Sequence, residues 1–408
     1  MISFDLGRGS RRDLLKLLAS SVGAFAAADL LGAGETITLP FENGTRPLVA
    51  YPGKRPLMVL TSRPPQLETP FPIFNEGILT PNDAFFVRYH LSNIPLEIDT
   101  DSFRLTIKGE VNTPLSLSLD DLRKNFEAVE TVAVAQCSGN SRGFSEPRVG
   151  GGQLAHGAMG NARWKGVRLK DVLEKAGVKA SAKQVSFDGL DTAVMPNTPD
   201  FVKALGMGHA LNGEVLIAYS MNGEDLPMLN GFPVRLVVPG YYSTYWVKHL
   251  HEITVLEKEF EGFWMKTAYR IPDTPGACVP PGTTPASTVP INRLNVRSFI
   301  TSHENGAAVK AGEKVALRGI AFDGGVGIKE VQFSGDGGRS WQSATLGEDL
   351  GRFSFREWTL AYQPPAKGTA EWKVRAFNRI GESQPMEALW NPAGYMRNVV
   401  ETVKVEIA

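Results

Sequence analysis

Short runs of alternating hydrophobic and polar residues occur along much of the chain, and this period of two is that of strands with one buried face. Residues 103–108 alternate in this way. Residues 131–136 and 234–238 are more continuously apolar and predict buried strands. Helical spacing is found in residues 118–126, which begin with a capping serine, and in residues 169–176. The pattern in this part of the chain predicts a mixed domain of short strands and short helices.

Beyond residue 290 the strand-like alternation recurs at regular intervals. Asp336-Gly337-Gly338 supplies a tight turn between two of the runs. Short strands at regular spacing with polar turns are typical of a β-sandwich, and they predict an immunoglobulin-like domain. The predicted strands of this domain are residues 315–320, 328–333, 353–358 and 371–377.

Two segments have neither period. Residues 29–84 are rich in proline and predict an extended segment that wraps over a surface without forming a core element. Residues 271–290 are dense in Pro, Gly and Thr and predict a linker. A chain of 408 residues is too long for one ordinary core. We therefore expect an α+β organisation, with a mixed domain over residues 85–275 and a sandwich over residues 276–408.

Residues 1–28 have the composition of an export signal. Arg11 and Arg12 precede a modest apolar stretch, which is followed by small residues that suit cleavage. The paired arginines resemble a twin-arginine signal, whose substrates are typically exported folded, often around a cofactor inserted in the cytoplasm. The stretch is short and interrupted, so we expect a periplasmic protein without membrane insertion. An amphipathic N-terminal helix is the alternative.

Charge and cysteine content exclude several classes of function. The 43 Lys and Arg residues equal the 43 Asp and Glu residues, so no positive field favours nucleic acid or an acidic membrane. Cys137 and Cys278 are the only cysteines, and the absence of a C-x-x-C pair excludes zinc ribbons, iron–sulfur ligation and c-type haem attachment. One disulfide is arithmetically possible, but Cys137 has a better use, and we expect Cys278, in the linker, to be inert.

Cys137 stands where an apolar run ends and Ser138-Gly139-Asn140 turns the backbone. A lone cysteine in such a place is ordinarily a small buried hydrophobe. Here the turn places the sulfur at the mouth of a sheet, and Arg142 is near enough in sequence to hold a thiolate or to gather anions. A soft thiolate suits a soft or high-valent metal better than calcium or magnesium.

Residues 136–142, Gln-Cys-Ser-Gly-Asn-Ser-Arg, resemble the cysteine motif of the sulfite oxidase family, in which the thiolate ligates molybdenum beside a pterin dithiolene. The resemblance runs from about Phe85 to the C-terminus. It implies a molybdopterin-binding domain followed by an immunoglobulin-like dimerisation domain. Further segments similar to the family follow in the same order, at residues 85–90, 161–169, 189–191, 230–235, 246–248 and 264–270.

The resemblance implies five catalytic residues, with Cys137 as the metal ligand. Arg88 and Arg142 would grip the oxyanion, since a guanidinium stays charged and bonds two oxygens at once. His90 is two residues from Arg88, so in an extended segment both point the same way, and it could tune the pocket charge near neutral pH. A structural histidine is the alternative. Tyr269 would donate a hydrogen bond to the metal oxo group or to sulfite.

The resemblance also implies that dispersed polar groups hold molybdopterin and its phosphate. Arg235 and Lys248 would contact the phosphate, and Asp191 and Asn230 would bind pterin or phosphate-side groups. Asn230 stands where the family often has a histidine, which makes its role less defined. The remaining implied cofactor contacts are Tyr89, His90, Cys137, Ser138, Trp246 and Val247.

Two departures from vertebrate members concern the substrate pocket. The tryptophan that lines their pocket is missing around Gln153-Leu154, which would widen the pocket or change its anion affinity. Residues 390–394 lack an arginine that those members carry nearby. His249 and His251 share a predicted strand face but lack a third metal ligand, and Gly150–Gly152 is best interpreted as a flexible loop.

Together these features predict a sulfite dehydrogenase that oxidises sulfite to sulfate at molybdenum. The sequence offers no haem-binding motif and no b5-like domain before Phe85, so electrons would pass to an external c-type cytochrome. A homodimer through the C-terminal domain is expected. The alternatives are another molybdenum oxo-transfer reaction, on a sulfoxide or nitrate, and an exported binding protein that has kept the fold without metal.

Overall fold

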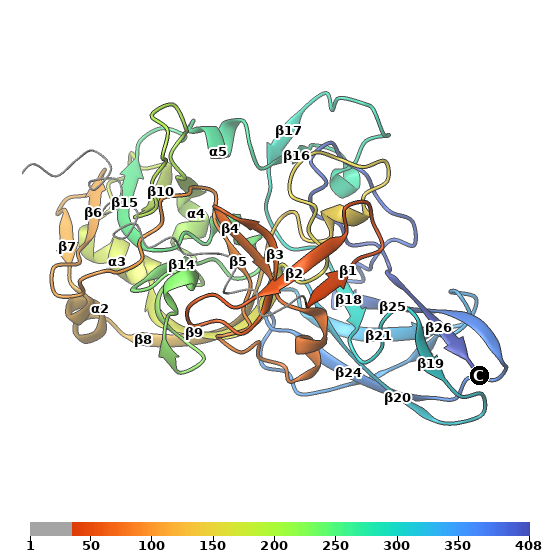
Figure 1. The fold of residues 1–408 in the computed structure, drawn as a ribbon. Coiled ribbons are helices and arrows are strands. Elements are labelled where there is room, and N and C mark those ends of the chain that lie inside the picture. Colours follow the sequence, from red (N-terminus) through yellow and green to blue (C-terminus); the bar gives the residue numbers. More distant parts are fainter. Residues whose placement is uncertain (1–34) are drawn as a thin grey trace, which may run out of the picture.

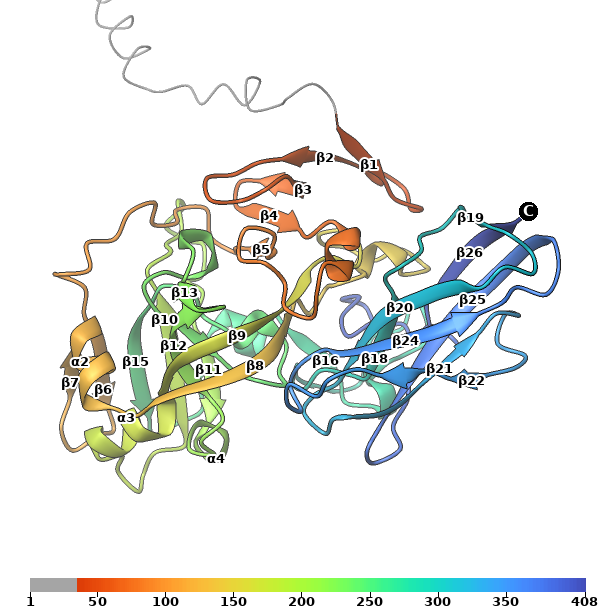
Figure 2. The ribbon, with the colours of Figure 1, turned by 90° about the horizontal axis from the view of Figure 1, so that it is seen from below.

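The computed structural model of the protein describes residues 35–408. The predicted export signal at residues 1–28 therefore lies outside the described residues. Two halves lie side by side, one of mixed strands and short helices and the other of strands, as Figures 1 and 2 show. A sheet built from the N-terminal segment crosses one face where the halves meet. The α+β class and the two-part organisation are as predicted.

Four strands of the proline-rich segment and the short strand that follows it, at residues 87–88, form an antiparallel five-stranded sheet. Its side chains share a small core, in which Leu57 and Leu67 pack with Val87 and Tyr89. The expectation that residues 29–84 contain no core element is therefore wrong, because hairpins this short carry too few positions to show a period. The strands are β1 (Thr36–Thr38), β2 (Thr45–Val49), β3 (Leu57–Ser62), β4 (Pro65–Glu68) and β5 (Val87–Arg88).

A long hairpin carries the cysteine loop. The predicted apolar strand is the end of β8 (Ala128–Gln136), which pairs along its whole length with β9 (Met159–Arg168). β9 also pairs with β12 (Leu216–Met221), whose other partners are β13 (Glu224–Asp225) and β14 (Arg235–Val237). The buried Trp164 of β9 donates its indole N–H to the Ala133 carbonyl at 3.0 Å. Cys137 thus leaves the sheet at a well-anchored end.

A second five-stranded sheet packs against the predicted helices. β15 and β6 are parallel, and the other neighbours are antiparallel. Ser118 caps α2 (Leu119–Asn125) through a reciprocal pair with Asp121, and α3 (Leu169–Ala176) ends at Gly177 in a left-handed conformation. The strands in order are β11 (Lys203–Gly206), β10 (Gln184–Gly189), β15 (Leu250–Leu256), β6 (Leu105–Gly109) and β7 (Leu115–Leu117), and the remaining helices are α4 (Met207–Ala210) and α5 (Phe263–Lys266).

The C-terminal half is the predicted sandwich, with Trp358 and Trp372 fully buried between its sheets. One sheet has the order β18 (Arg297–Ile300), β20 (Val315–Phe322), β24 (Arg356–Tyr362) and β23 (Thr345–Leu346). The other has the order β19 (Ala307–Val309), β26 (Thr402–Ile407), β25 (Gly368–Asn378), β21 (Ile328–Ser334) and β22 (Gln342–Ser343).

The structure corrects two predicted boundaries. Residues 353–355 precede β24, because Phe353 and Phe355 turn into the core of the first half and the Phe353 carbonyl accepts from Val134 N at 2.9 Å. The predicted linker contains a hairpin of β16 (Arg270–Pro272) and β17 (Thr288–Pro290). The halves are therefore joined by shared packing as well as by the chain.

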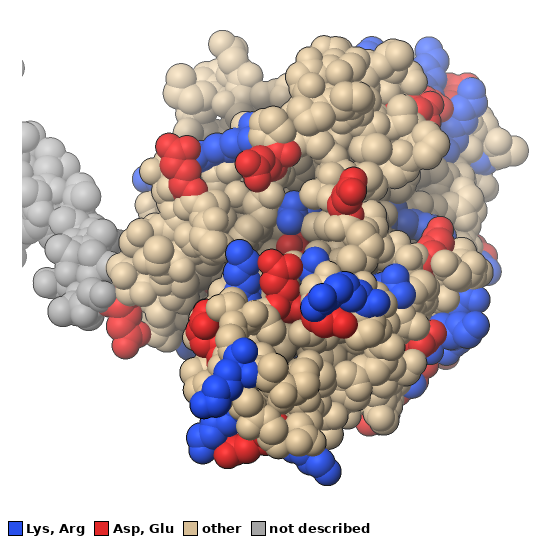
Figure 3. Space-filling view, turned by 90° about the vertical axis from the view of Figure 1, so that its right-hand side faces the viewer, with Lys and Arg blue, Asp and Glu red and all other residues tan. Residues whose placement is uncertain are grey.

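The surface reflects the balanced composition. Positive and negative side chains are interspersed over the face in Figure 3. Among residues 35–408, none of the helices is long and apolar enough to span a bilayer.

Candidate active site

Cys137 lies directly after β8, and a network of backbone bonds fixes its loop. Its N–H donates to the Ala158 carbonyl at 2.9 Å, and Arg142 N donates to the Gly139 carbonyl at 3.0 Å. Ser141 has the left-handed φ of 69°, which reverses the chain before Arg142. Cys137 is buried, and its side chain lines two neighbouring cavities.

The wider cavity, of about 470 Å³, contains all five predicted catalytic residues. They come from three separate parts of the chain: β5 and the residues after it, the cysteine loop with its following turn, and the segment after α5. No aspartate or glutamate of the described chain lines this cavity. The predicted catalytic residues that line it are Arg88, His90, Cys137, Arg142 and Tyr269.

Arg88 and Arg142 have no carboxylate partner within the part of the chain that the structure describes. Arg142 is held instead by carbonyl groups, with Nε donating to Ala393 at 2.8 Å and Nη1 to Gly152 at 3.2 Å. A Cβ at Gly139 would lie 2.7 Å from the Arg142 guanidinium, so glycine is needed for this close approach. Two guanidinium groups without counter-charges beside a thiol form a site for an oxyanion.

Tyr269 and His90 are hydrogen-bonded to each other through Oη and Nε2. The His90 ring stacks on Phe201 with centroids 3.8 Å apart. Burial, followed by the charges of Arg88 and Lys248, lowers the pKa of His90 well below its usual value. This lowered pKa favours the neutral form of the His90 ring near pH 7. Burial raises the pKa of Tyr269, so its hydroxyl keeps its proton.

The smaller cavity, of about 30 Å³, brings together most of the predicted cofactor residues. Three of the predicted cofactor residues do not line this cavity. Tyr89 is buried, with Oη bonded to His249 Nε2 at 2.6 Å, and the Val247 carbonyl accepts from Leu236 N at 2.8 Å. Asp191 is buried near Lys248, and its negative charge raises the pKa of that lysine against the larger effect of burial. The predicted residues that line the cavity are Arg88, His90, Cys137, Ser138, Asn230, Arg235, Trp246 and Lys248.

These lining residues fit an anionic pterin cofactor. Burial lowers the pKa of Lys248 to about 7 and that of Arg235 to about 10, because their positive charges lack sufficient compensation. Buried polar atoms of Ser138 (Oγ), Thr244 (Oγ1) and Arg235 (Nε) have no hydrogen-bond partner in the described chain. A phosphate-bearing anion would supply both the missing charge and the missing hydrogen bonds.

Lys54 is a residue of this site that the sequence did not reveal. Its Nζ donates to Asn230 Oδ1 at 2.5 Å and to the Asn82 carbonyl at 2.6 Å. Burial lowers its pKa to about 7. Asn230, at the position where the family often has a histidine, thus orients a buried cation beside Arg235. A single lysine in a proline-rich segment carries no pattern that could have indicated this contact.

Lys203 and Tyr395 were also missed, because neither residue belongs to a sequence pattern that indicates its contacts. Lys203 Nζ donates to the Trp264 carbonyl at 2.6 Å and lies 5.2 Å from the centre of the Tyr269 ring. Burial lowers the pKa of Lys203 to about 7. Tyr395 lines the wider cavity, as does Gly150–Gly152, which was interpreted only as a flexible loop.

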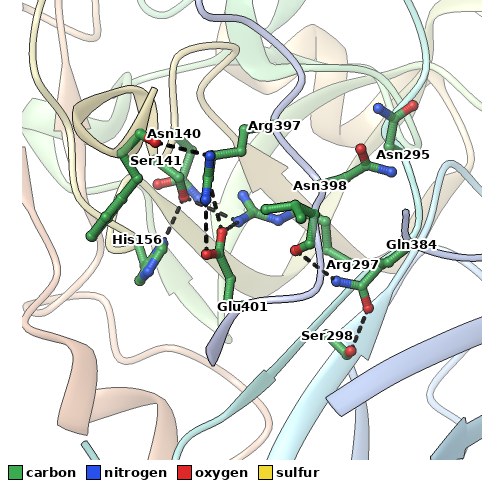
Figure 4. Close-up of polar contacts among 12 residues, drawn as sticks. Asn140, Ser141, His156, Asn295, Arg297, Ser298, Gln384, Arg397, Asn398 and Glu401 are labelled. Carbon is green, nitrogen blue, oxygen red and sulfur yellow. Dashed lines mark hydrogen bonds and ion pairs between the residues drawn. The ribbon is translucent and has the colours of Figure 1, made fainter. Parts of the chain in front are cut away.

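A buried polar network ties the turn at Arg142 to the sandwich half (Figure 4). Ser141 Oγ bonds His156 Nδ1 at 2.7 Å and accepts from Arg297 Nη2 at 3.1 Å. Both carboxylate oxygens of Glu401 accept from Arg397 at 3.1 Å, and one also pairs with Arg297 at 3.3 Å. Burial raises the pKa of Glu401, but His156, Arg397 and Arg297 outweigh burial and lower it overall.

The other candidate metal groups do not form a site. His249 precedes β15 with a positive φ of 50° and bonds Tyr89 and the Phe232 carbonyl, so it does not share a strand face with His251 as predicted. No group of three His, Cys, Asp or Glu residues gathers within residues 35–408. Cys137 and Cys278 are both free thiols.

The fold and this site define a molybdenum oxidoreductase that binds molybdopterin. Residues 90–264 match the family model described as "Oxidoreductase molybdopterin binding domain", and residues 288–408 match "Mo-co oxidoreductase dimerisation domain". Mitochondrial sulfite oxidase of Mus musculus is 35% identical over 387 residues, which cover 90% of this chain and 69% of that protein. Sulfite oxidase of Arabidopsis thaliana is 31% identical over 85% of this chain and 93% of its own length. The chain belongs to the sulfite oxidase family.

Two further similarities extend the comparison. The solved structure of the sulfane dehydrogenase SoxCD from Paracoccus pantotrophus has a TM-score of 0.71 at 23% identity, and covers 93% of this chain and 89% of that one. This likeness concerns the fold. NAD(P)H nitrate reductase of Hordeum vulgare is 28% identical over 88% of this chain but 43% of its own length. The dimerisation-domain match indicates a homodimer.

Proposed function

We propose that this protein is a sulfite dehydrogenase, which oxidises sulfite to sulfate at a molybdenum centre held by the Cys137 thiolate. The observation that carries the proposal is the pair of guanidinium groups, Arg88 and Arg142, that line the same cavity as Cys137 without a carboxylate among its lining residues. Sulfite is a small dianion, and such a cavity attracts and orients it. The similarity to sulfite oxidases supports this substrate.

When bound, the molybdenum cofactor supplies oxo transfer and accepts two electrons, and the protein residues prepare the site for that chemistry. Cys137 would hold the metal as a thiolate. Lys248 and Arg235 line the smaller cavity and would balance the anionic cofactor there, and Lys54, bonded to Asn230, would add a third positive charge nearby. The neutral His90 keeps the Tyr269 hydroxyl in place, where it can donate a hydrogen bond toward the reacting oxygen.

We further propose that electrons leave singly to an external c-type cytochrome, and that the protein acts as a periplasmic homodimer after twin-arginine export. The chain itself has no C-x-x-C pair for attaching a c-type haem, which supports a separate carrier. The paired arginines at the N-terminus support the export route. Sedimentation of the purified protein tests the dimer.

The activity is tested by sulfite-dependent reduction of cytochrome c and, in parallel, of ferricyanide by purified protein of known molybdenum content. Cys137→Ser should abolish both reactions. Cys278→Ser is the matched control, because Cys278 is the second of only two cysteines and lies outside both cavities, and it should retain both reactions.

The outcomes separate the parts of the proposal. Reduction of ferricyanide without reduction of cytochrome c would support sulfite oxidation and contradict the proposed acceptor. Bound molybdenum with no reduction of either acceptor would contradict the substrate, and assays with sulfoxides and nitrate would follow. Activity retained by Cys137→Ser would contradict the assigned ligand.

A further inference from the structure

The loop at residues 391–396 belongs to the sandwich half, yet it closes one side of the wider cavity. Arg142 Nε donates to the Ala393 carbonyl at 2.8 Å, and Met396 N donates to the Ser138 carbonyl at 3.1 Å. Ala393 and Tyr395 both line the cavity. The second domain therefore supplies part of the wall that faces Cys137.

Tyr395 contacts two of the predicted catalytic side chains at once. Its ring is nearly parallel to that of Tyr269, with 10° between the planes and 5.4 Å between the centroids. The guanidinium carbon of Arg142 lies 5.0 Å from the centre of the Tyr395 ring. Ring stacking and cation–π contacts of this kind are favourable and directional. Tyr395 thus restricts the orientation of both neighbours.

The loop holds Tyr395 firmly. The buried Asn391 donates from Nδ2 to the Tyr395 carbonyl at 2.8 Å, and its Oδ1 accepts from Tyr395 N at 3.1 Å. Gly394 has a φ of 59°, and a Cβ there would lie 2.8 Å from Arg142 Cγ, so glycine permits the close approach. These contacts therefore fix the position of the Tyr395 backbone in the loop.

Arg142 depends on this contact because its other restraints use only part of the guanidinium. Nε and Nη1 donate to carbonyl groups, whereas Nη2 makes no such bond, and the Tyr395 hydroxyl lies close to the guanidinium. Nη2 is thus available to an oxyanion. Residue 393 is alanine, so the charge on this side of the cavity comes from Arg142.

We propose that Tyr395 is a positioning residue, which sets the oxyanion affinity of the wider cavity by holding the Arg142 guanidinium and the Tyr269 ring in place. This inference rests on the proposed sulfite oxidation and adds to it a positioning residue from the second domain. Because Arg142 would bind the anion before and during the reaction alike, loss of the ring should raise KM more than it lowers kcat.

The test compares Tyr395→Leu, Tyr395→Phe and Trp390→Leu in the molybdenum-loaded enzyme. Trp390 is in the same segment and donates to the Pro147 carbonyl at 2.9 Å, but it lines neither cavity, so its variant controls for general loosening of the loop. The measurements are KM and kcat for sulfite, the Kd of sulfate by calorimetry, and Tm.

Tyr395→Leu should raise KM for sulfite and Kd for sulfate about tenfold, with kcat within about threefold of the wild type. Tyr395→Phe should recover most of the lost affinity because the ring remains, and Trp390→Leu should match the wild type. If Tyr395→Leu lowers Tm strongly, Tyr395→Met, whose flexible unbranched side chain adapts to the space without a ring, takes its place.

Unchanged affinity in Tyr395→Leu, or an equal loss in Trp390→Leu, would overturn the role. A Tyr395→Phe variant as weak as Tyr395→Leu would assign the effect to the hydroxyl and overturn positioning by the ring. If the wild type binds sulfate but does not oxidise sulfite, the proposed function fails, and the sulfate Kd values still decide the role of Tyr395.

Discussion

The two arginines of the candidate site have no acidic neighbour in the cavity that they line. Arg88 and Arg142 line a cavity that has no acidic lining residue, which distinguishes them from the many surface arginines that form ion pairs. The wider cavity therefore carries an excess of positive charge next to the Cys137 thiol. This excess is the physical basis for anion binding.

Arg142→Met should raise KM for sulfite by tenfold or more, because a methionine of similar length removes a charge-assisted contact with the anion. Steady-state kinetics on protein of equal molybdenum content measures the effect. Arg148→Met is the matched control: Arg148 pairs with Glu42 at 2.9 Å on the surface, and its loss should change KM by less than twofold. Equal effects of the two variants would refute a specific anion contact.

Among the elements, the N-terminal sheet has a larger role than its proline-rich sequence indicates. Its last strand, β5, carries Arg88, and the turn before β3 places Lys54 against Asn230. The sheet is thus a wall of both cavities. Residues outside the matched range of 90–264 thereby help to build the cofactor site.

Lys54→Met should weaken cofactor retention, because it removes a buried cation that would balance the cofactor and leaves Asn230 without its partner. We expect at least a threefold fall in molybdenum and pterin content per protein after gel filtration. Arg55→Met is the control, since Arg55 turns outward to Glu76 and Asp83. Full retention in Lys54→Met would show that Lys54 serves only the fold.

At the scale of the whole molecule, the two halves are joined by buried charge. Arg297 is fully buried, and Glu401 is the carboxylate that pairs with both Arg297 and Arg397. Ser141 connects this cluster to the turn that carries Arg142. The sandwich therefore supports the active site directly, in addition to any role in dimerisation.

Glu401→Gln should destabilise the protein by about 3–5 kcal/mol, because the fully buried Arg297 and the partly buried Arg397 lose their shared counter-charge. Urea denaturation followed by tryptophan fluorescence measures the change. Asp120→Asn, which removes the exposed pair with Lys124, should cost less than about 1 kcal/mol. A similar small cost for both variants would mean that the buried cluster contributes little.

Stability of the cofactor-free protein should rise with pH between about 7.5 and 9.5. Lys54, Lys203 and Lys248 have pKa values lowered by burial to about 7, whereas lysine in an unfolded chain titrates near 10.4. Between these values the unfolded chain binds more protons, so unfolding becomes less favourable as pH rises, by up to about 1.4 kcal/mol per pH unit for each lysine.

Urea denaturation at several pH values measures this slope. The window avoids Glu68, whose pKa is raised to about 7 by burial and whose effect has the opposite sign below that pH. Lys203→Met should reduce the slope, and bound cofactor should flatten it by keeping the lysines charged. A flat profile in the cofactor-free protein would contradict the uncompensated burial of these amines.

Much of the fold and the centre of the site could be predicted from the sequence because they depend on local patterns. The apolar run ending at Cys137, the cap at Ser118 and the regular spacing of the sandwich strands all lie within short stretches of chain. The paired short hairpins of residues 36–68 could not be predicted, because their strands show no period.

Local sequence patterns were enough to indicate the candidate metal ligand, the family resemblance and the two-part organisation, since neighbouring residues carry each of these signals. The contacts of Lys54 with Asn230, of Lys203 with the Tyr269 ring, and of Tyr395 with Arg142 became visible in the folded structure alone. These pairs are far apart along the chain, and a buried charge or a stacked ring acquires its role from neighbours that folding brings within a few ångströms.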